Sequence, residues 1–193
     1  FCSTQKPMGK LIIFSAPSGS GKTTIVRRLM DEMSGLEFSV SATSRAPRGA
    51  EQHGKDYYFL SAEEFDGLIA EDSFVEWEEV YAGTKYGTLK SELERIWAKG
   101  NTILFDVDVK GGVRLKSIFG ADALPIFIMP PSVEELRRRL EGRATDSAET
   151  IAKRVAKADF EISKSSEFDH VVINDRLEDA VTEAREIITN FLA

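Results

Sequence analysis

Apolar and polar positions alternate along this chain in a way that predicts strands and helices in turn. The run at residues 11–14 is short and fully apolar, which is typical of a buried strand, and the stripe from Ile25 to Met33 has the spacing of one helix face. Further strands are expected at residues 37–41, 74–81, 101–106, 123–129 and 171–173. Further helices are expected at residues 61–68, 89–97, 132–140 and 177–191. Because strands that alternate with helices form parallel sheets, the pattern predicts an α/β fold with a parallel sheet flanked by helices.

One stretch departs from this pattern. Residues 41–58, SATSRAPRGAEQHGKDYY, are polar and are interrupted by Pro47, Gly49 and Gly54. Behind them, Ser61 and Glu64 have the spacing of a capping box, and the strand at 74–81 carries a carboxylate inside it. We therefore expect residues 41–88 to form a small mixed α/β subdomain inserted into the main fold.

Composition restricts the classes of protein that fit. The 193 residues suffice for one substantial domain, and 42% hydrophobic with 30% charged residues is an ordinary globular composition. No apolar run approaches the roughly 20 residues of a membrane span, so no membrane association is expected. The net charge of −7 argues against a nucleic-acid surface and favours a small ligand.

Cysteine and histidine are too few for two further kinds of site. A single cysteine, Cys2, excludes an internal disulfide, and with only two histidines there is no zinc cluster. A reducing, cytoplasmic location fits this usage, and residues 1–8 are expected to be a disordered tail. The sequence leaves open whether the chain forms a homo-oligomer.

The chemistry concentrates first in a glycine-rich loop between the first strand and the first helix. Gly19 and Gly21 let backbone N–H groups turn toward a phosphate, while Lys22 supplies a positive charge and Thr23 a hydroxyl for Mg²⁺. The strict form of the motif begins with glycine, where this chain has alanine. An acidic residue ends the strand at 101–106, as expected near the Mg²⁺ of a bound nucleotide. The loop is therefore expected to bind a nucleoside triphosphate through the following residues: Ala16, Pro17, Ser18, Gly19, Ser20, Gly21, Lys22, Thr23 and Thr24.

Two groups of arginines supply the second signal. Arg45 and Arg48 flank Pro47 and repel each other unless an anion such as a phosphate lies between them, although such a pair is also common on solvated surfaces. The segment RRRLEGRATDSAETIAKR carries further arginines, and its helix is interrupted at Gly142, Ala144 and Thr145. These arginines form either a helix face balanced by glutamates or a flap that closes over ATP phosphates.

Several blocks together resemble the guanylate kinase family in the family's order. They are APSGSGKTT, SVSATSRAPRGAEQHGKDYYFLS, FVEWEEVYAGTKYGT, FDVDVKGG, PPSVEELRRRLEGRATD and VVINDRLEDA, and they cover nearly all of residues 10–193. The resemblance implies a P-loop nucleoside monophosphate kinase that transfers the γ-phosphoryl group of ATP to GMP or dGMP with Mg²⁺, in purine metabolism. It also implies a core at residues 9–40, 89–133 and 166–193, a GMP-binding subdomain at 41–88 and a helical lid at 134–165.

The resemblance carries over residue by residue. It implies that Arg45, Arg48, Tyr57 and Tyr86 hold the GMP phosphate. It implies that Ser41, Glu76, Thr88 and Asp108 surround the guanine, and it assigns Asp106 to the GMP site as well. It places Asn174 near adenine and Thr23 and Asp106 at Mg²⁺. The implied catalytic residues are Lys22, Arg45, Arg139, Arg143 and Arg154. Two departures stand out, since Lys110 replaces the usual Gln and the segment from Tyr81 to Lys85 holds one extra residue.

The chemistry of guanine supports this interpretation independently. Guanine presents N1–H and an amino group side by side, so the Glu76 carboxylate can accept from both, and hydroxyls of Ser41 or Thr88 can donate to O6. Three other functions are considered. A non-catalytic phosphopeptide-binding module would be expected to lose phosphate-loop or lid residues, and a kinase of a phosphorylated sugar would be expected to lose the guanine-binding carboxylates. A GTPase or ATPase switch would lack the acceptor arginines.

Overall fold

The computed structural model describes residues 9–143 and 146–193. The expected tail at residues 1–8 and the expected helix break at Ala144 and Thr145 therefore lie outside the described residues. Two compact units make up the chain, one formed by the chain up to Leu36 with Leu104–Ala193 and the other by Glu37–Ile103. Among the described residues, no helix has the length and apolar character needed to cross a membrane.

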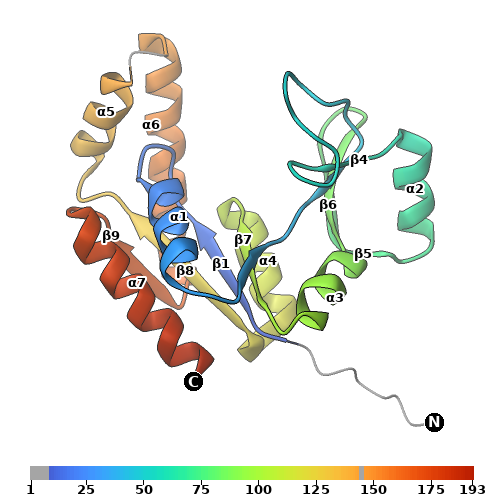
Figure 1. Ribbon diagram of the computed structural model, residues 1–193. Helices are drawn as coiled ribbons and strands as arrows, with labels where there is room; N and C mark the ends of the chain where they lie inside the picture. Colours follow the sequence, from blue (N-terminus) through green and yellow to red (C-terminus); the bar gives the residue numbers. More distant parts are fainter. Residues whose placement is uncertain (1–8, 144–145) are drawn as a thin grey trace. The chain divides into compact units, whose positions relative to one another are not determined.

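The larger sheet has five strands in the order β2-β7-β1-β8-β9 (Figure 1). Its strands are β1 (Leu11–Ser15), β2 (Leu36–Phe38), β7 (Thr102–Asp106), β8 (Ala123–Met129) and β9 (His170–Ile173). β8 pairs in parallel with both β1 and β9. The apolar run that predicts β1 is fully buried, as a central strand covered on both faces requires.

Helices cover both faces of this sheet. The helices of this unit are α1 (Lys22–Glu32), α4 (Val109–Phe119), α5 (Val133–Gly142), α6 (Ala148–Ser163) and α7 (Leu177–Leu192), with 3-10 turns η1 (Gly120–Asp122) and η2 (Ser165–Glu167), and of these α1, α4 and α7 flank the sheet. In Figure 1, α1 and α7 lie side by side in front of the strands, and α4 packs on β1 and β8 from behind. α5 and α6 pack on each other around a small core of their own, formed by Leu136, Leu140, Ile151, Val155 and Ala158.

The second unit is built on a four-stranded sheet in the order β4-β3-β6-β5. Its elements are β3 (Ala42–Thr43), β4 (Tyr58–Phe59), α2 (Ala62–Ala70), β5 (Phe74–Tyr81), β6 (Thr84–Leu89) and α3 (Lys90–Ala98). β3 runs parallel to β4 and antiparallel to β6, which in turn runs antiparallel to β5. Phe65 of α2 stacks on Phe74 with ring centroids 4.5 Å apart, which closes the core under this sheet.

Most predicted elements are present, and the α/β fold with a parallel sheet is confirmed. The capping box of α2 is also confirmed, because Ser61 and Glu64 exchange both hydrogen bonds. The strand expected at residues 37–41 is shorter, since β2 ends at Phe38 and the Val40 N–H donates to the Glu92 carboxylate at 3.0 Å instead of to a strand. The hydrophobic pattern did not indicate β3, β4, β6, α4 or α6, although the family resemblance implied that residues 134–165 are helical.

Candidate active site

The glycine-rich loop folds into a tight turn between β1 and α1. Gly19 and Gly21 both have a φ of 88°, a backbone conformation that residues with a Cβ rarely adopt. A Cβ on Gly21 would also collide with the amide nitrogen of Asn174, which donates to the Ser20 carbonyl at 2.8 Å. The loop is therefore held by Asn174, from the segment after β9, as well as by its own turn.

A cavity of about 390 Å³ opens over this loop. Its lining contains Ala16, Pro17, Ser18, Gly19, Ser20, Gly21, Lys22, Thr23 and Thr24. The sequence predicted all nine as ATP-binding residues, and the structure brings them together around one space. Because Lys22 opens α1, the positive end of this helix faces the same region, which favours an anion there.

Charged side chains of both signs complete the lining. Lys22 forms an ion pair with Asp106, which ends β7, and Asp108 follows two residues later. Arg143, which follows α5, and Lys157 and Glu161 of α6 also line the cavity. Glu161 is only 7% exposed, and this burial raises the pKa of its carboxyl above the usual value. Lys157, 3.5 Å away, offsets part of that shift. Three cations thus face three carboxylates, so an incoming polyphosphate meets cations that are already positioned.

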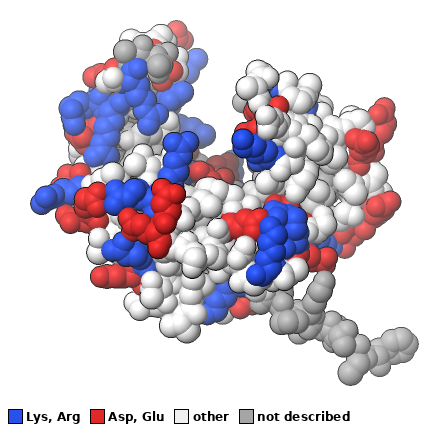
Figure 2. All heavy atoms as spheres, viewed as in Figure 1, with Lys and Arg blue, Asp and Glu red and all other residues white. Residues whose placement is uncertain are grey.

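Lys and Arg side chains gather over α5 and α6, at the upper left of Figure 2. Of the three lid arginines predicted to be catalytic, Arg143 lines the phosphate-loop cavity. Arg154 lies at its edge, where Nη1 donates to the Ser18 hydroxyl at 3.3 Å and pairs with Asp146 at 3.2 Å. Gly142 ends α5 and Arg143 follows it, which agrees with the helix interruption that the sequence predicts at Gly142.

Arg139 occupies a different position. Its Nη2 donates to the Asn174 carbonyl and its Nε to Glu135, both at 3.0 Å. It borders a second cavity of about 440 Å³, which shares Gly19, Gly21, Thr24 and Arg143 with the first site and adds Asn174, Asp175 and Leu177. The structure therefore places Arg139 and Asn174 together, next to the phosphate loop.

In the second unit, the predicted phosphate-binding residues gather around Arg45. Its Nε donates to the Tyr86 hydroxyl at 3.1 Å, and its guanidinium carbon lies 5.0 Å from the Tyr57 ring centroid. The two tyrosine rings meet edge to face with centroids 6.0 Å apart. Arg48 is exposed on the adjacent loop, and no hydrogen bond or ion pair of its guanidinium is found among the described residues. One arginine is thus fixed in place and the other extends into solvent.

The predicted guanine-binding pair lies on neighbouring strands of the same sheet. Glu76 of β5 is paired in register with Thr88 of β6, and the Thr88 hydroxyl donates to Glu76 Oε1 at 2.9 Å. This hydroxyl therefore contacts the carboxylate, and donation to guanine O6 by Ser41 or Thr88 stays a prediction. Ser41 precedes β3, and its carbonyl accepts from the Tyr58 N–H at 2.9 Å. Asp106 and Asp108 belong to the first unit, where the Asp108 side chain caps α4 by accepting from the Gly111 N–H at 2.8 Å.

Comparison with known proteins matches this arrangement to one family. A family model described as guanylate kinase matches residues 8–191. The chain belongs to the guanylate kinase family. A guanylate kinase of Porphyromonas gingivalis is 54% identical over 187 residues, covering 96% of this chain and all of the relative. One of Bacteroides thetaiotaomicron is 52% identical over 190 residues, covering 98% and 93%. The crystal structure of guanylate kinase from Anaplasma phagocytophilum superimposes with a TM-score of 0.70 at 33% identity, covering 96% of this chain and 87% of that one.

The sequence analysis did not identify three charged residues that line or support the sites of this guanylate kinase family member. Lys157 and Glu161 line the phosphate-loop cavity from α6, and Glu51 binds Arg45. The spacing of Lys157 and Glu161 on one helix face was a signal, but exposed ion pairs of that spacing are common and do not indicate a cavity. Glu51 lies in a loop, where no periodicity reveals which charges meet.

Proposed function

We propose that this chain transfers the γ-phosphoryl group of ATP to GMP, and to dGMP, as an ATP:GMP phosphotransferase. The observation that carries the proposal is the cavity over the phosphate loop, with Lys22 at its base and Arg143 at its border. In this assignment residues 41–88 bind GMP, residues 134–165 form the lid, and residues 9–40, 89–133 and 166–193 form the core. Membership of the guanylate kinase family supports the same reaction.

For the ATP half, the loop N–H groups and Lys22 would bind the β- and γ-phosphates, with Asn174 near adenine. The residues present suit a phosphate-bound Mg²⁺, because Thr23 and Asp106 supply hard oxygen donors at one cavity. No group of three or more His, Cys, Asp or Glu side chains that could hold a metal ion is found in the described part of the chain. When bound through ATP, Mg²⁺ would neutralise charge on the phosphates.

For the GMP half, Arg45, Arg48, Tyr57 and Tyr86 would bind the phosphate, and Glu76 would accept hydrogen bonds from guanine N1–H and the amino group. Thr88 holds the Glu76 carboxylate in place by its hydrogen bond. Adenine has no such pair of donors, so the carboxylate would discriminate against AMP. Ser41, Asp106 and Asp108 complete the assigned GMP residues.

The chemistry itself needs charge neutralisation more than proton transfer. The second pKa of a phosphate monoester is about 6, so the attacking GMP oxygen is already ionised near neutral pH. Two anions must nevertheless meet, and charge gathers on the transferred group. Lys22, Arg143 and Arg154 on the ATP side, with Arg139 bracing the segment after β9, would offset that charge.

The function is tested with a panel of acceptors. MgATP is supplied with GMP, dGMP, AMP, CMP, UMP or a phosphorylated sugar, and ADP formation is followed in a coupled assay. We expect turnover with GMP and slower turnover with dGMP, and little with the others. Comparable turnover with AMP or with the sugar would refute the assignment of the acceptor, and absence of turnover with every acceptor would favour a phosphopeptide-binding module.

Glu76→Gln is expected to weaken selection of guanine. The amide must present either one oxygen or an N–H to two guanine donors, which leaves a buried donor unpaired and costs about 2 kcal/mol, or roughly 30-fold in kcat/KM for GMP. The KM for ATP is expected to stay unchanged. Glu63→Gln on α2 is the control, since this exposed side chain of the same unit lies outside the assigned site. An unchanged ratio of GMP to AMP turnover in Glu76→Gln would exclude this residue from recognition.

A further inference from the structure

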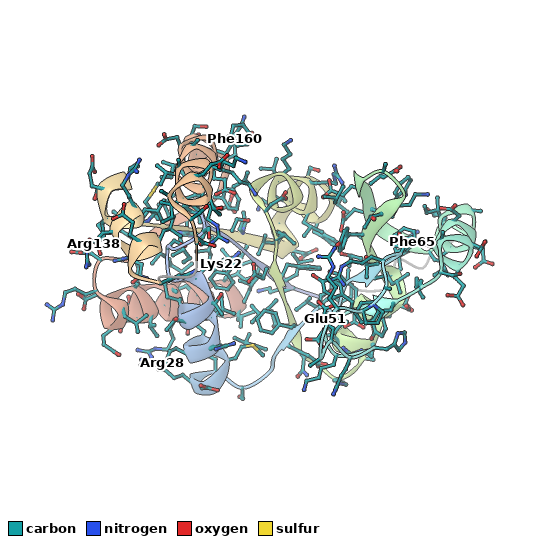
Figure 3. All side chains as sticks on the ribbon, turned by 90° about the horizontal axis from the view of Figure 1, so that it is seen from above. Lys22, Arg28, Glu51, Phe65, Arg138 and Phe160 are labelled. Atoms are coloured by element: carbon teal, nitrogen blue, oxygen red, sulfur yellow. The ribbon has the colours of Figure 1, made fainter. Side chains whose placement is uncertain are left out.

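Glu51 binds the two arginines of the acceptor site at once. Its Oε2 and Oε1 accept from Nη1 and Nη2 of Arg45 at 2.7 and 2.9 Å, and Oε2 also accepts from the Arg48 backbone N–H at 2.8 Å. The hydrogen bonds from Arg45, and then that from Arg48, lower the pKa of the Glu51 carboxyl to about 2. Glu51 is therefore an anion over the whole working range of pH. Figure 3 labels this side chain in the second unit.

The same contacts leave only one part of the Arg45 guanidinium available. A guanidinium carries five N–H groups. Nε donates to the Tyr86 hydroxyl at 3.1 Å, Nη1 donates to the Ala46 carbonyl at 3.0 Å as well as to Glu51, and Nη2 gives one N–H to Glu51. Within the described residues the second N–H of Nη2 has no acceptor. This N–H lies on the edge shared with Nε, next to the Tyr86 hydroxyl.

Packing holds the guanidinium in this orientation. Its carbon lies 5.0 Å from the centroid of the Tyr57 ring and 5.8 Å from that of Phe59, and the Arg45 side chain is only 11% exposed. An arginine fixed in this way loses little further conformational freedom when an anion binds. Arg48, in contrast, keeps an exposed guanidinium. The two arginines are thus prepared to different degrees for the same anion.

We infer that Glu51 is a positioning residue for the phosphate of GMP, which it serves by occupying the Nη1/Nη2 edge of Arg45 and leaving the second Nη2 N–H, beside the Tyr86 hydroxyl, for the phosphate. The Tyr86 hydroxyl accepts from Nε and keeps its own O–H, so the phosphate can accept one hydrogen bond from Nη2 and one from Tyr86, and an orientation fixed in advance favours this pair of contacts. The inference rests on the proposed function, because it takes GMP as the ligand of this unit.

Two other roles for Glu51 make different predictions. If its carboxylate occupied the place of the phosphate and had to leave, its removal would strengthen GMP binding. If it only shaped the turn in which the Glu51 N–H donates to the Arg48 carbonyl at 3.1 Å, its removal would weaken binding of the nucleoside as much as that of the nucleotide. Guanosine, which lacks the phosphate, separates the positioning role from the shaping role.

The experiment compares Glu51→Gln with wild type in the full chain. For the positioning role we expect the KM for GMP to rise about tenfold, as expected when an arginine that donates to the phosphate loses its fixed orientation, with kcat and the KM for ATP changed less than about twofold. Calorimetry is expected to show a similar loss of GMP affinity and unchanged guanosine affinity. Glu63→Gln on α2 is the matched control, an exposed carboxylate of the same unit. A KM for GMP that falls or stays constant overturns the inference, as does an equal loss of guanosine affinity.

A double-mutant cycle tests whether Glu51 acts through Arg45. In an Arg45→Ala background, adding Glu51→Gln is expected to change the KM for GMP by less than about twofold, because contacting residues are not additive. A full tenfold further loss would contradict the inference. Glu51→Asp provides a second variant should Glu51→Gln unfold, since it keeps the charge but shortens the reach, and an intermediate loss is expected. Failure of the proposed function would be evident separately, as absence of GMP turnover in wild type.

Discussion

Replacing Lys22 by alanine is expected to lower kcat by about a thousandfold while leaving GMP affinity within about twofold of wild type. Lys22 opens α1 at the base of the phosphate-loop cavity, where it forms an ion pair with Asp106. In the proposed reaction its ammonium neutralises charge that builds on the transferred phosphoryl group, so the loss falls on the transition state. In the proposed assignment the phosphate of GMP is held by Arg45, Arg48 and the two tyrosines of the second unit, so these contacts would be kept. Steady-state kinetics with saturating ATP and calorimetry with GMP measure the two quantities.

Lys153→Ala serves as the control for Lys22→Ala. Lys153 is exposed on α6, outside the lining of the phosphate-loop cavity, and lies 3.7 Å from Glu149. Its removal is expected to leave kcat unchanged. A large fall in GMP affinity in Lys22→Ala would show that the lysine belongs to the acceptor site, and normal turnover would remove it from the reaction.

The phosphate loop is the part of the site that the sequence describes best. Glycines in phase with Lys22 and Thr23, after an apolar strand, leave few arrangements of the backbone, and all nine predicted loop residues line one cavity. The motif does not reveal which residues elsewhere in the chain hold the loop in place. Asn174 follows β9, more than a hundred residues later, and its hydrogen bond to Ser20 depends on the order of strands in the sheet.

Local physical causes explain why the sequence pattern did not predict some of the elements. α4 begins with Gly111 and Gly112 in its first turns, residues that disfavour helices, and it forms because Asp108 caps its N-terminus and Leu115 and Phe119 are buried. β3 and β4 have two residues each, too few for any alternation to be read. Pairing with longer strands and with each other stabilises them, and this is a tertiary effect.

The charged side chains were also predicted only in part, because the sequence places them near a site without giving their partners. Arg45 and Arg48 were predicted as a symmetric pair around one anion, yet Glu51 binds the side chain of only the first. Arg139, Arg143 and Arg154 were predicted as equivalents, yet only Arg143 lines the phosphate-loop cavity. Spacing along a chain indicates which charges are near a site, but the partner of each one depends on side-chain packing that the sequence pattern does not encode.

Arg143→Ala is expected to have the largest effect among the three lid arginines, with kcat lowered by about a hundredfold to a thousandfold and GMP affinity nearly unchanged. An arginine that stabilises a transferring phosphoryl group contributes about 10³-fold or more to turnover in related chemistry. Arg143 is placed for this role, because it follows the end of α5 and lines the phosphate-loop cavity together with Lys22. Kinetics of the single variants, with ATP and GMP varied independently, separate kcat from the two KM values.

The neighbouring arginines make the comparison specific. Nη1 of Arg154 donates to the Ser18 hydroxyl at a long 3.3 Å and also pairs with the Asp146 carboxylate. Arg154→Ala is therefore expected to lower kcat less than Arg143→Ala does. Arg139 holds the Asn174 carbonyl, so Arg139→Ala is expected to raise the KM for ATP through the loop support as well as to lower kcat. Arg137→Ala is the matched control, since this exposed arginine of α5 lies outside the linings of both cavities and its removal changes the local charge. If Arg137→Ala impaired turnover as much as Arg143→Ala, the arginines of this segment would act through their overall positive charge, and the position of Arg143 in the cavity would not explain its contribution.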